Sequence, residues 1–113
     1  MKLPSADRAI VEDAKIRDYL LSPAHPVGRF KARVFAAAGY RQNAWQRLRD
    51  DLLALAVVLD VIVSEDQRHG QRFVGQGELP GTVGRPLPVV TVWLIPSEGS
   101  APRLITVYPG SAP

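Results

Sequence analysis

Three side chains that could act on a phosphate stand close together between residues 20 and 40, in LLSPAHPVGRFKARVFAAAGY. His25 lies between two prolines, and Arg29 and Lys31 follow where a helix is expected to begin. The free N–H groups and the positive dipole end of such a start favour a bound anion. A histidine titrates near neutral pH and could act there as an acid or a base. The alternative is a loop whose charged side chains simply face water.

A second group of polar side chains alternates along three expected strands, over residues 71–79, 88–96 and 103–108. Successive side chains of a strand point to opposite faces, so one row is expected to be buried and the other exposed. The expected core row is Val90, Val92, Leu94, Ile105 and Val107. The expected open row is Thr91, Trp93, Thr106 and Tyr108, with Arg72 and Gln76 from the neighbouring strand. Threonine and tyrosine also favour exposed strands that have no function, which is the competing interpretation.

Other chemical signals are weaker. Arg85 lies in the loop VGRPLP, and His69 lies in the turn EDQRHG, where a solvated role is expected. The glycine-rich GQGELPG is not expected to form a phosphate loop, because it follows a strand and leads to a turn. The chain has two histidines, far apart in sequence, and no cysteine. It therefore predicts no metal site and no cofactor.

The elements that would position these residues change in character along the chain. Apolar residues at helical spacing predict helices over residues 12–22, 27–38 and 41–59, the last capped by Asn43. The second helix is expected to bury Phe30, Val34, Phe35 and Ala38. After these come the three strands and a weaker one at 60–64, joined by connections of hairpin length. This order predicts an α+β fold, with about three N-terminal helices on one face of a three- to four-stranded antiparallel sheet.

Length and composition indicate a single globular domain. The chain has 113 residues, of which 46% are hydrophobic and 22% charged, so we expect one domain over 1–113 with an ordered core at about 7–109. The formal net charge of +3 is compatible with a polyanionic partner. No apolar run reaches the roughly 18 residues of a membrane span, and the N-terminus does not look like a signal peptide. The absence of cysteine fits the reducing cytoplasm, and it also fits a small protein that must cross a membrane without being misoxidised.

Several stretches resemble a family of small bacterial domains of unknown function that have the character of toxin modules. They are KIRDYLLSPAHPVGRFKARVFAAAGY, HGQRFVGQGEL, VVTVWLI and APRLITVYP, and the likeness covers about residues 7 to 109. The order of helices and strands is more distantly similar to the barnase/EndoU/colicin/RelE-like ribonucleases. This resemblance implies metal-independent RNA cleavage by attack of the 2′-hydroxyl, with an antitoxin or immunity protein as partner. It implies action in the cytoplasm, either by the chain alone or after delivery as part of a larger secreted protein.

If that resemblance holds, the residues divide into two sets. The catalytic set is His25, Lys31, Thr106 and Tyr108, and the substrate-binding set is Arg29, Arg72, Gln76, Arg85, Thr91 and Trp93. His25 would be the base or acid, Lys31 would stabilise the phosphorane, and Trp93 would stack on a base. Two other functions remain open from the residues. One is a non-catalytic interaction module, antitoxin-like or immunity-like, that uses the open sheet face. The other is a plain nucleic-acid binder that contacts phosphates.

Overall fold

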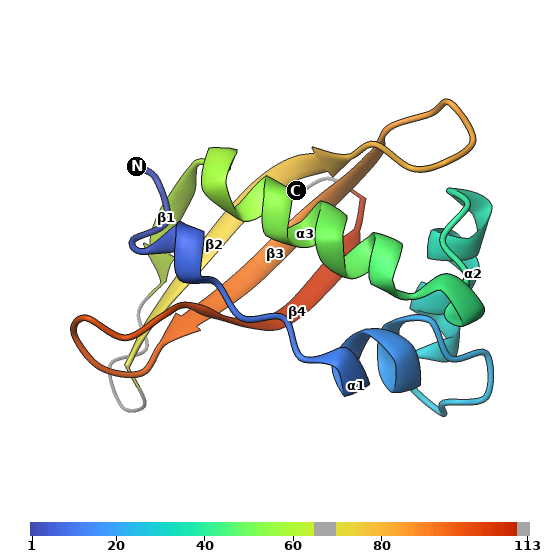
Figure 1. Ribbon diagram of the computed structural model, residues 1–113, viewed down its shortest axis with the longest axis horizontal. Helices are drawn as coiled ribbons and strands as arrows, with labels where there is room; N and C mark the ends of the chain where they lie inside the picture. The colour runs from blue at the N-terminus through green and yellow to red at the C-terminus, as the bar shows by residue number, and fades with distance from the viewer. Residues whose placement is uncertain (65–69, 111–113) are drawn as a thin grey trace.

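The computed structural model describes residues 1–64 and 70–110, and His69 lies outside this part of the chain. Short helical turns come first, followed by two longer helices and then the strands (Figure 1). The helical elements are η1 (Ala6–Arg8), α1 (Asp13–Lys15), η2 (Ile16–Leu20), α2 (Arg29–Ala37), η3 (Gln42–Ala44) and α3 (Gln46–Val58). The strands are β1 (Val61–Ser64), β2 (Gln71–Leu79), β3 (Leu87–Ile95) and β4 (Arg103–Pro109).

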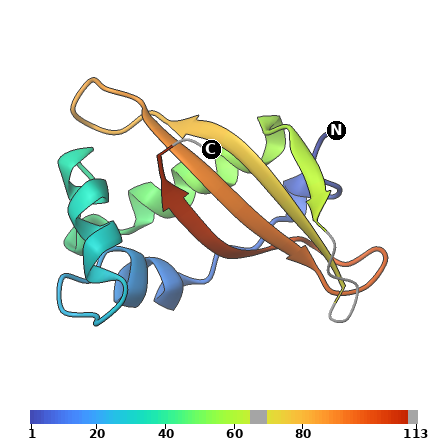
Figure 2. The same cartoon turned by 180° about the vertical axis from the view of Figure 1, so that it is seen from behind.

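The four strands form one antiparallel sheet in the order β1-β2-β3-β4. Helix α3 lies across one face of this sheet, which we call the packed face (Figure 1). The view from behind shows the other face, the open face, with no helix across its centre (Figure 2). Helix α2 stands beside the β4 edge. The expected α+β class is confirmed, and the weak strand at 60–64 is β1.

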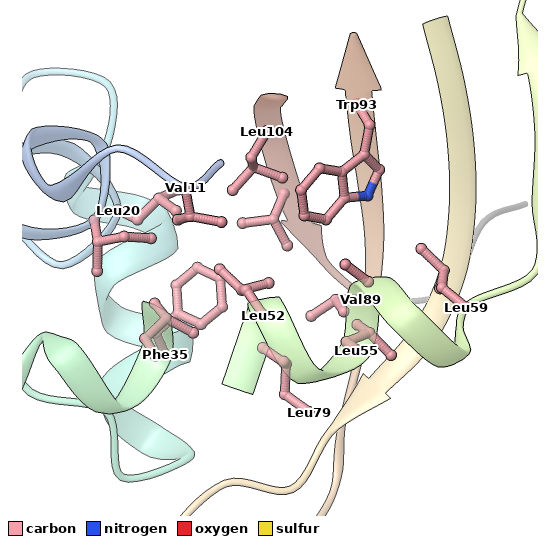
Figure 3. Close-up of a cluster of buried hydrophobic side chains, with 14 of the residues drawn as sticks. Val11, Leu20, Phe35, Leu52, Leu55, Leu59, Leu79, Val89, Trp93 and Leu104 are labelled. Atoms are coloured by element: carbon pink, nitrogen blue, oxygen red, sulfur yellow. The ribbon is translucent and has the colours of Figure 1, made fainter. Parts of the chain in front are cut away.

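One apolar cluster fills the space between α3 and the packed face. The helical spacing of Trp45, Leu48, Leu52, Leu55 and Leu59 predicts a buried stripe. Trp45 is half-buried against the same core, and the four leucines are buried. They meet side chains of the sheet, and Trp93 is the largest of the fully buried residues (Figure 3). Phe35 of α2 and Leu20 of η2 extend the cluster, so the helices beside β4 share the same core.

Two glycines of β2 explain how closely α3 approaches the sheet. A Cβ atom at Gly75 would lie 2.6 Å from a methyl group of Leu59, and one at Gly77 would lie 2.8 Å from a methyl group of Leu55. Any side chain at either position would therefore push the helix outward. In the sequence GQGELPG, the first two glycines therefore let α3 pack closely against β2.

The assignment of β3 to its two faces was wrong. Thr91 and Trp93 lie on the packed face and are fully buried, whereas the expected core residues Val90, Val92 and Leu94 lie on the open face, half-buried. The indole Nε1 donates to Thr91 Oγ1 at 2.8 Å, and that hydroxyl donates to the carbonyl of Gly75 at 3.2 Å. Both polar groups are therefore satisfied inside the core, where Trp93 cannot stack on a base and Thr91 cannot touch a substrate.

Strand β4 contains an irregularity that the alternation pattern did not predict. The register shifts between Val92 and Trp93, which pair with Thr106 and Leu104, so Ile105 is the additional residue. Leu104 and Val107 consequently both reach the core, while Ile105, an expected core residue, is half-buried. Thr106 and Tyr108 remain on the open face, as expected.

Two expectations for the helices also need correction. In α2 the buried residues are Ala32 and Phe35, followed by Ala38, while Phe30 and Val34 are exposed. The exposed pair lies on the side of α2 away from the core. Asn43 does not cap α3, because η3 comes first and the helix begins at Gln46.

Candidate functional site at the start of α2

The loop before α2 is held against η2 by a close backbone approach. A Cβ atom at Gly28 would lie 2.1 Å from the carbonyl oxygen of Tyr19, so only glycine fits there. Pro23 and Pro26 follow the preceding helix, and the loop between it and α2 is a series of turns where an extended loop was expected. This packing brings the ring of Tyr19 beside the residues that follow Gly28.

His25 caps its own loop. Its Nδ1 accepts hydrogen bonds from the backbone N–H groups of Val27 and Gly28, both at 3.0 Å, and its carbonyl accepts from the N–H of Arg29. These N–H groups are therefore not free to bind an anion, contrary to the expectation for this helix start. In the neutral ring Nδ1 is then the acceptor and Nε2 carries the proton. His25 presents an Nε2–H donor, and acid–base exchange at Nδ1 would first have to break the two loop hydrogen bonds.

Lys31 reaches from α2 around the β4 edge to the open face. Its Nζ donates to the hydroxyl of Thr106 at 2.9 Å and lies over two aromatic rings, 4.5 Å from the centroid of Tyr108 and 5.2 Å from that of Tyr19. The side chain is half-buried. Among the described residues no carboxylate pairs with it, so the ammonium is held by dipoles and π faces.

The ring of Tyr19 joins the histidine to the lysine. It packs edge-on against the His25 ring, with centroids 4.9 Å apart, and its face is turned to Lys31. Three separate parts of the chain thus meet here, and we call the five residues Tyr19, His25, Lys31, Thr106 and Tyr108 the lysine cluster. Of the four residues predicted as catalytic, Lys31 contacts Thr106 and Tyr108 directly, and His25 is connected to it only through Tyr19, which was not among the predicted residues. Tyr19 shares helical spacing with the apolar Ile16 and Leu20, and this pattern predicts a core residue.

The other predicted residues are more dispersed. Gln76 is exposed on the open face in the same cross-strand row as Tyr108, with Val90 between them, which places it about 10 Å away at usual strand spacing. Arg72 is half-buried further along β2, opposite Leu94. Arg85 is exposed in the loop between β2 and β3.

Arg29 turns away from the lysine cluster. It lines a cleft on the other side of α2, and its guanidinium lies 4.7 Å from the centroid of the Phe30 ring. Among the described residues, no group of three or more histidine, aspartate or glutamate side chains could hold a metal ion. The helices of the described ranges are all too short or too polar to cross a membrane.

The lysine cluster is suited to a negatively charged group. A fixed cation without a carboxylate partner attracts an anion, and its ammonium has two further protons to donate besides the one used by Thr106. The ammonium of Lys31 lies over the Tyr108 ring, and the Tyr19 ring connects it to His25, so the donors of these side chains are linked through aromatic contacts. The rings of Tyr19 and Tyr108 lie against the ammonium on two sides.

Comparison with known proteins gives the family and the fold. A family model described as a domain of unknown function, DUF6883, matches residues 2–111. The chain belongs to this family. No curated protein matches it in sequence.

A solved structure shares the fold of this DUF6883 domain. It is a chain of the contact-dependent growth inhibition toxin–immunity protein complex from Klebsiella pneumoniae 342, with a TM-score of 0.70 and 15% sequence identity. The match covers 97% of the DUF6883 chain and all of the other chain. The expected relationship to a domain family of unknown function is confirmed, and the fold is that of a component of a toxin–immunity complex.

Proposed function

We propose that this domain is a metal-independent ribonuclease toxin of a bacterial toxin–antitoxin or toxin–immunity system, and that it cleaves RNA at the lysine cluster. The observation that carries the proposal is the Lys31 ammonium, held by the Thr106 hydroxyl and two tyrosine rings with no carboxylate among the described residues. The shared fold with a chain of a toxin–immunity complex supports the biological setting. A cognate antitoxin or immunity protein would then be its partner.

Cleavage needs few groups. The 2′-oxygen of the ribose attacks the adjacent phosphorus, the bond to the 5′-oxygen breaks, and a 2′,3′-cyclic phosphate forms. The proton of the 2′-hydroxyl goes to water, and Lys31 supplies the proton that the leaving 5′-oxygen takes, then recovers one from solvent. The same ammonium stabilises the additional negative charge of the transition state.

The remaining residues of the cluster position the phosphodiester. The Nε2–H of His25 donates to a non-bridging phosphate oxygen, and the hydroxyls of Thr106 and Tyr108 orient the ribose. Tyr108 is half exposed, so its ring also provides a surface on which an unpaired base can stack. Water has access to the same edge of the sheet.

A cleavage assay with matched lysine variants tests this function. Purified protein is incubated with end-labelled single-stranded RNA in the presence of EDTA, and the products are separated on a denaturing gel. We expect Lys31→Ala to lower the cleavage rate about 100-fold. Lys31→Arg should retain part of it. Lys2→Ala is the control, because Lys2 pairs with Asp60 on the exposed surface, and should cleave as wild type does.

Expression in bacteria connects the chemistry to toxicity. Wild type should arrest growth and leave discrete RNA fragments, and Lys31→Ala should abolish both. His25→Ala should also reduce cleavage, but it should cost about 1 kcal/mol of stability as well, because the loop loses its cap. Undiminished cleavage by folded Lys31→Ala, or no cleavage by folded wild type, would refute the proposal.

The second candidate is a non-catalytic interaction module, and the apolar character of the open face supports it. Val74, Val90, Val92 and Leu94 form half-buried rows there, and Ile62 is 70% exposed. Such a surface fits the immunity side of a toxin–immunity pair. Under this function Val92→Asp would abolish capture of a cognate toxin, whereas Lys31→Ala would leave it intact.

A further inference from the structure

An arginine-lined cleft lies on the side of α2 that faces away from the lysine cluster. It has a volume of about 410 Å³ and lies between α2, the chain after η2 and the turn that follows Tyr40. Arg29 and Arg33 line it from α2, and Arg41 and Gln42 line it from the turn. No aspartate or glutamate of the described residues contributes to its lining.

Among the described residues, no carboxylate neutralises the positive charge in this cleft. Within residues 1–64 and 70–110, none of the three arginines forms an ion pair, and all three are exposed. Most other arginines of the described chain are neutralised, as Arg47 is by Asp51 and Arg103 by Glu12. Three uncompensated guanidinium groups around one cavity form a site for an anion, and their planar donors suit phosphate oxygens.

The rest of the lining argues for a nucleotide chain in preference to a bare ion. Leu21, Ala32 and Ala36 provide an apolar floor, and Tyr40 closes one side. A hydrated inorganic ion gains nothing from such a surface, whereas a ribose or a base can pack on it. The cleft volume also lies within the range of pockets that hold small organic ligands.

The position of the cleft connects it to the lysine cluster. Lys31 lies between Arg29 and Arg33 in sequence, about 3 Å along the helix axis from each at the usual rise of an α-helix. The two sites are thus separated by roughly the width of one helix, about 10 Å. A single strand a few nucleotides long can occupy both by passing over the start of α2.

We propose that this arginine cleft binds the phosphates of single-stranded RNA that flank the bond held at the lysine cluster. The inference rests on the proposed ribonuclease function and extends it, because it assigns the substrate a second contact region. Under this proposal, Arg29 binds a phosphate that neighbours the scissile phosphate and does not contact the scissile phosphate itself.

Binding of a labelled RNA, measured by fluorescence anisotropy, tests this assignment. The probe is a fluorescein-labelled single-stranded RNA of 12 nucleotides, titrated with Lys31→Ala protein so that it stays intact. Adding Arg33→Gln and Arg41→Gln should weaken binding at least about 10-fold at low salt. It should also reduce the slope of log K against log salt by about 1.4, the value for two lost phosphate contacts. Both residues are exposed, so the variant should keep its thermal midpoint.

The matched control removes the same charge elsewhere. Lys2→Gln with Arg8→Gln changes two exposed cations of the N-terminal segment, which lies at the opposite end of the molecule from α2 (Figure 1). Lys2 pairs with Asp60, and Arg8 donates to the carbonyl of Gly99. The RNA affinity of this control variant should stay within about twofold of the Lys31→Ala parent if the cleft is specific. An equal loss in both double variants, or no loss in the cleft variant, would overturn the assignment.

The result also separates the cleft from the cleavage. If wild type cleaves RNA while the cleft variant binds it normally, the cleft assignment is wrong and the ribonuclease stands. If RNA binds through the cleft but wild type does not cleave it, the cleft stands as a nucleic-acid site and the ribonuclease is wrong. If folded wild type neither binds nor cleaves RNA, both are wrong.

Discussion

Thr91 and Thr106 carry the same hydroxyl on neighbouring strands, and the two faces of the sheet use it in different ways. On the packed face, Thr91 accepts from Trp93 and donates to a backbone carbonyl, so its hydrogen bonds are completed inside the core. On the open face, Thr106 accepts from the ammonium of Lys31, a half-buried side chain that reaches around the β4 edge. The packed face uses the threonine hydroxyl inside the core, and under the proposed function the open face uses it to position Lys31.

The largest expected difference in stability between the two faces comes from removing one aromatic ring from each. Trp93→Ala should lower the free energy of unfolding by about 3 to 5 kcal/mol, because a fully buried indole leaves a cavity. Tyr108→Ala should cost less than about 1 kcal/mol, since that side chain is half exposed. Urea unfolding followed by circular dichroism gives both values. Equal costs would mean that the two faces do not differ in the way described.

The sequence was ambiguous about which face of β3 is buried. Both rows of β3 are apolar, so alternation alone could not decide which row was buried. The prediction placed the uniformly aliphatic row of Val90, Val92 and Leu94 in the core, whereas the structure buries the row that contains the large Trp93 ring. A usable signal was present in β2, because Gly75 and Gly77 pair with Thr91 and Val89 and mark the face that the helix approaches.

The candidate site was predictable in part for a similar reason. His25 and Lys31 are close in sequence, and the alternation of β4 near its end placed Thr106 and Tyr108 on the open face. Tyr19 and the contact between α2 and β4 depend on tertiary packing, which the local pattern does not contain. The additional residue at Ile105 is likewise a property of strand pairing, so the burial of Leu104 could not be predicted.

A second test exchanges the hydroxyl for a methyl group at each threonine. Thr91→Val should lower the free energy of unfolding by about 2 kcal/mol, because the buried Nε1–H of Trp93 loses its acceptor. Thr106→Val should change stability by less than about 0.5 kcal/mol. It should instead lower RNA cleavage about 10-fold, since Lys31 loses the partner that positions it. The reverse pattern, with stability lost at Thr106 and cleavage lost at Thr91, would contradict the division between the faces.

The smallest effect concerns a hydroxyl buried on the α3 side of the molecule. Tyr40 donates to Asp51 at 2.7 Å and accepts from the N–H of Gly81 at 3.1 Å, which connects α3 to the turn after β2. Burial, together with the hydrogen bond to the Asp51 carboxylate, raises the pKa of Tyr40 well above its ordinary value of 10. Tyr40→Phe should cost about 1 kcal/mol at neutral pH, because the N–H of Gly81 loses its acceptor.

The raised pKa makes this cost depend on pH in a defined direction. Below about pH 10 the Tyr40 hydroxyl is protonated in both the folded and the unfolded chain, and its full contribution to stability is present. Above that pH the unfolded chain releases the proton while the folded protein retains it, so the free energy of unfolding falls. The difference between wild type and Tyr40→Phe should therefore shrink as the pH rises from 9 to 11. Urea unfolding across this range measures it, with Tyr108→Phe as the matched control. A constant difference would show that Tyr40 is not held protonated by the fold.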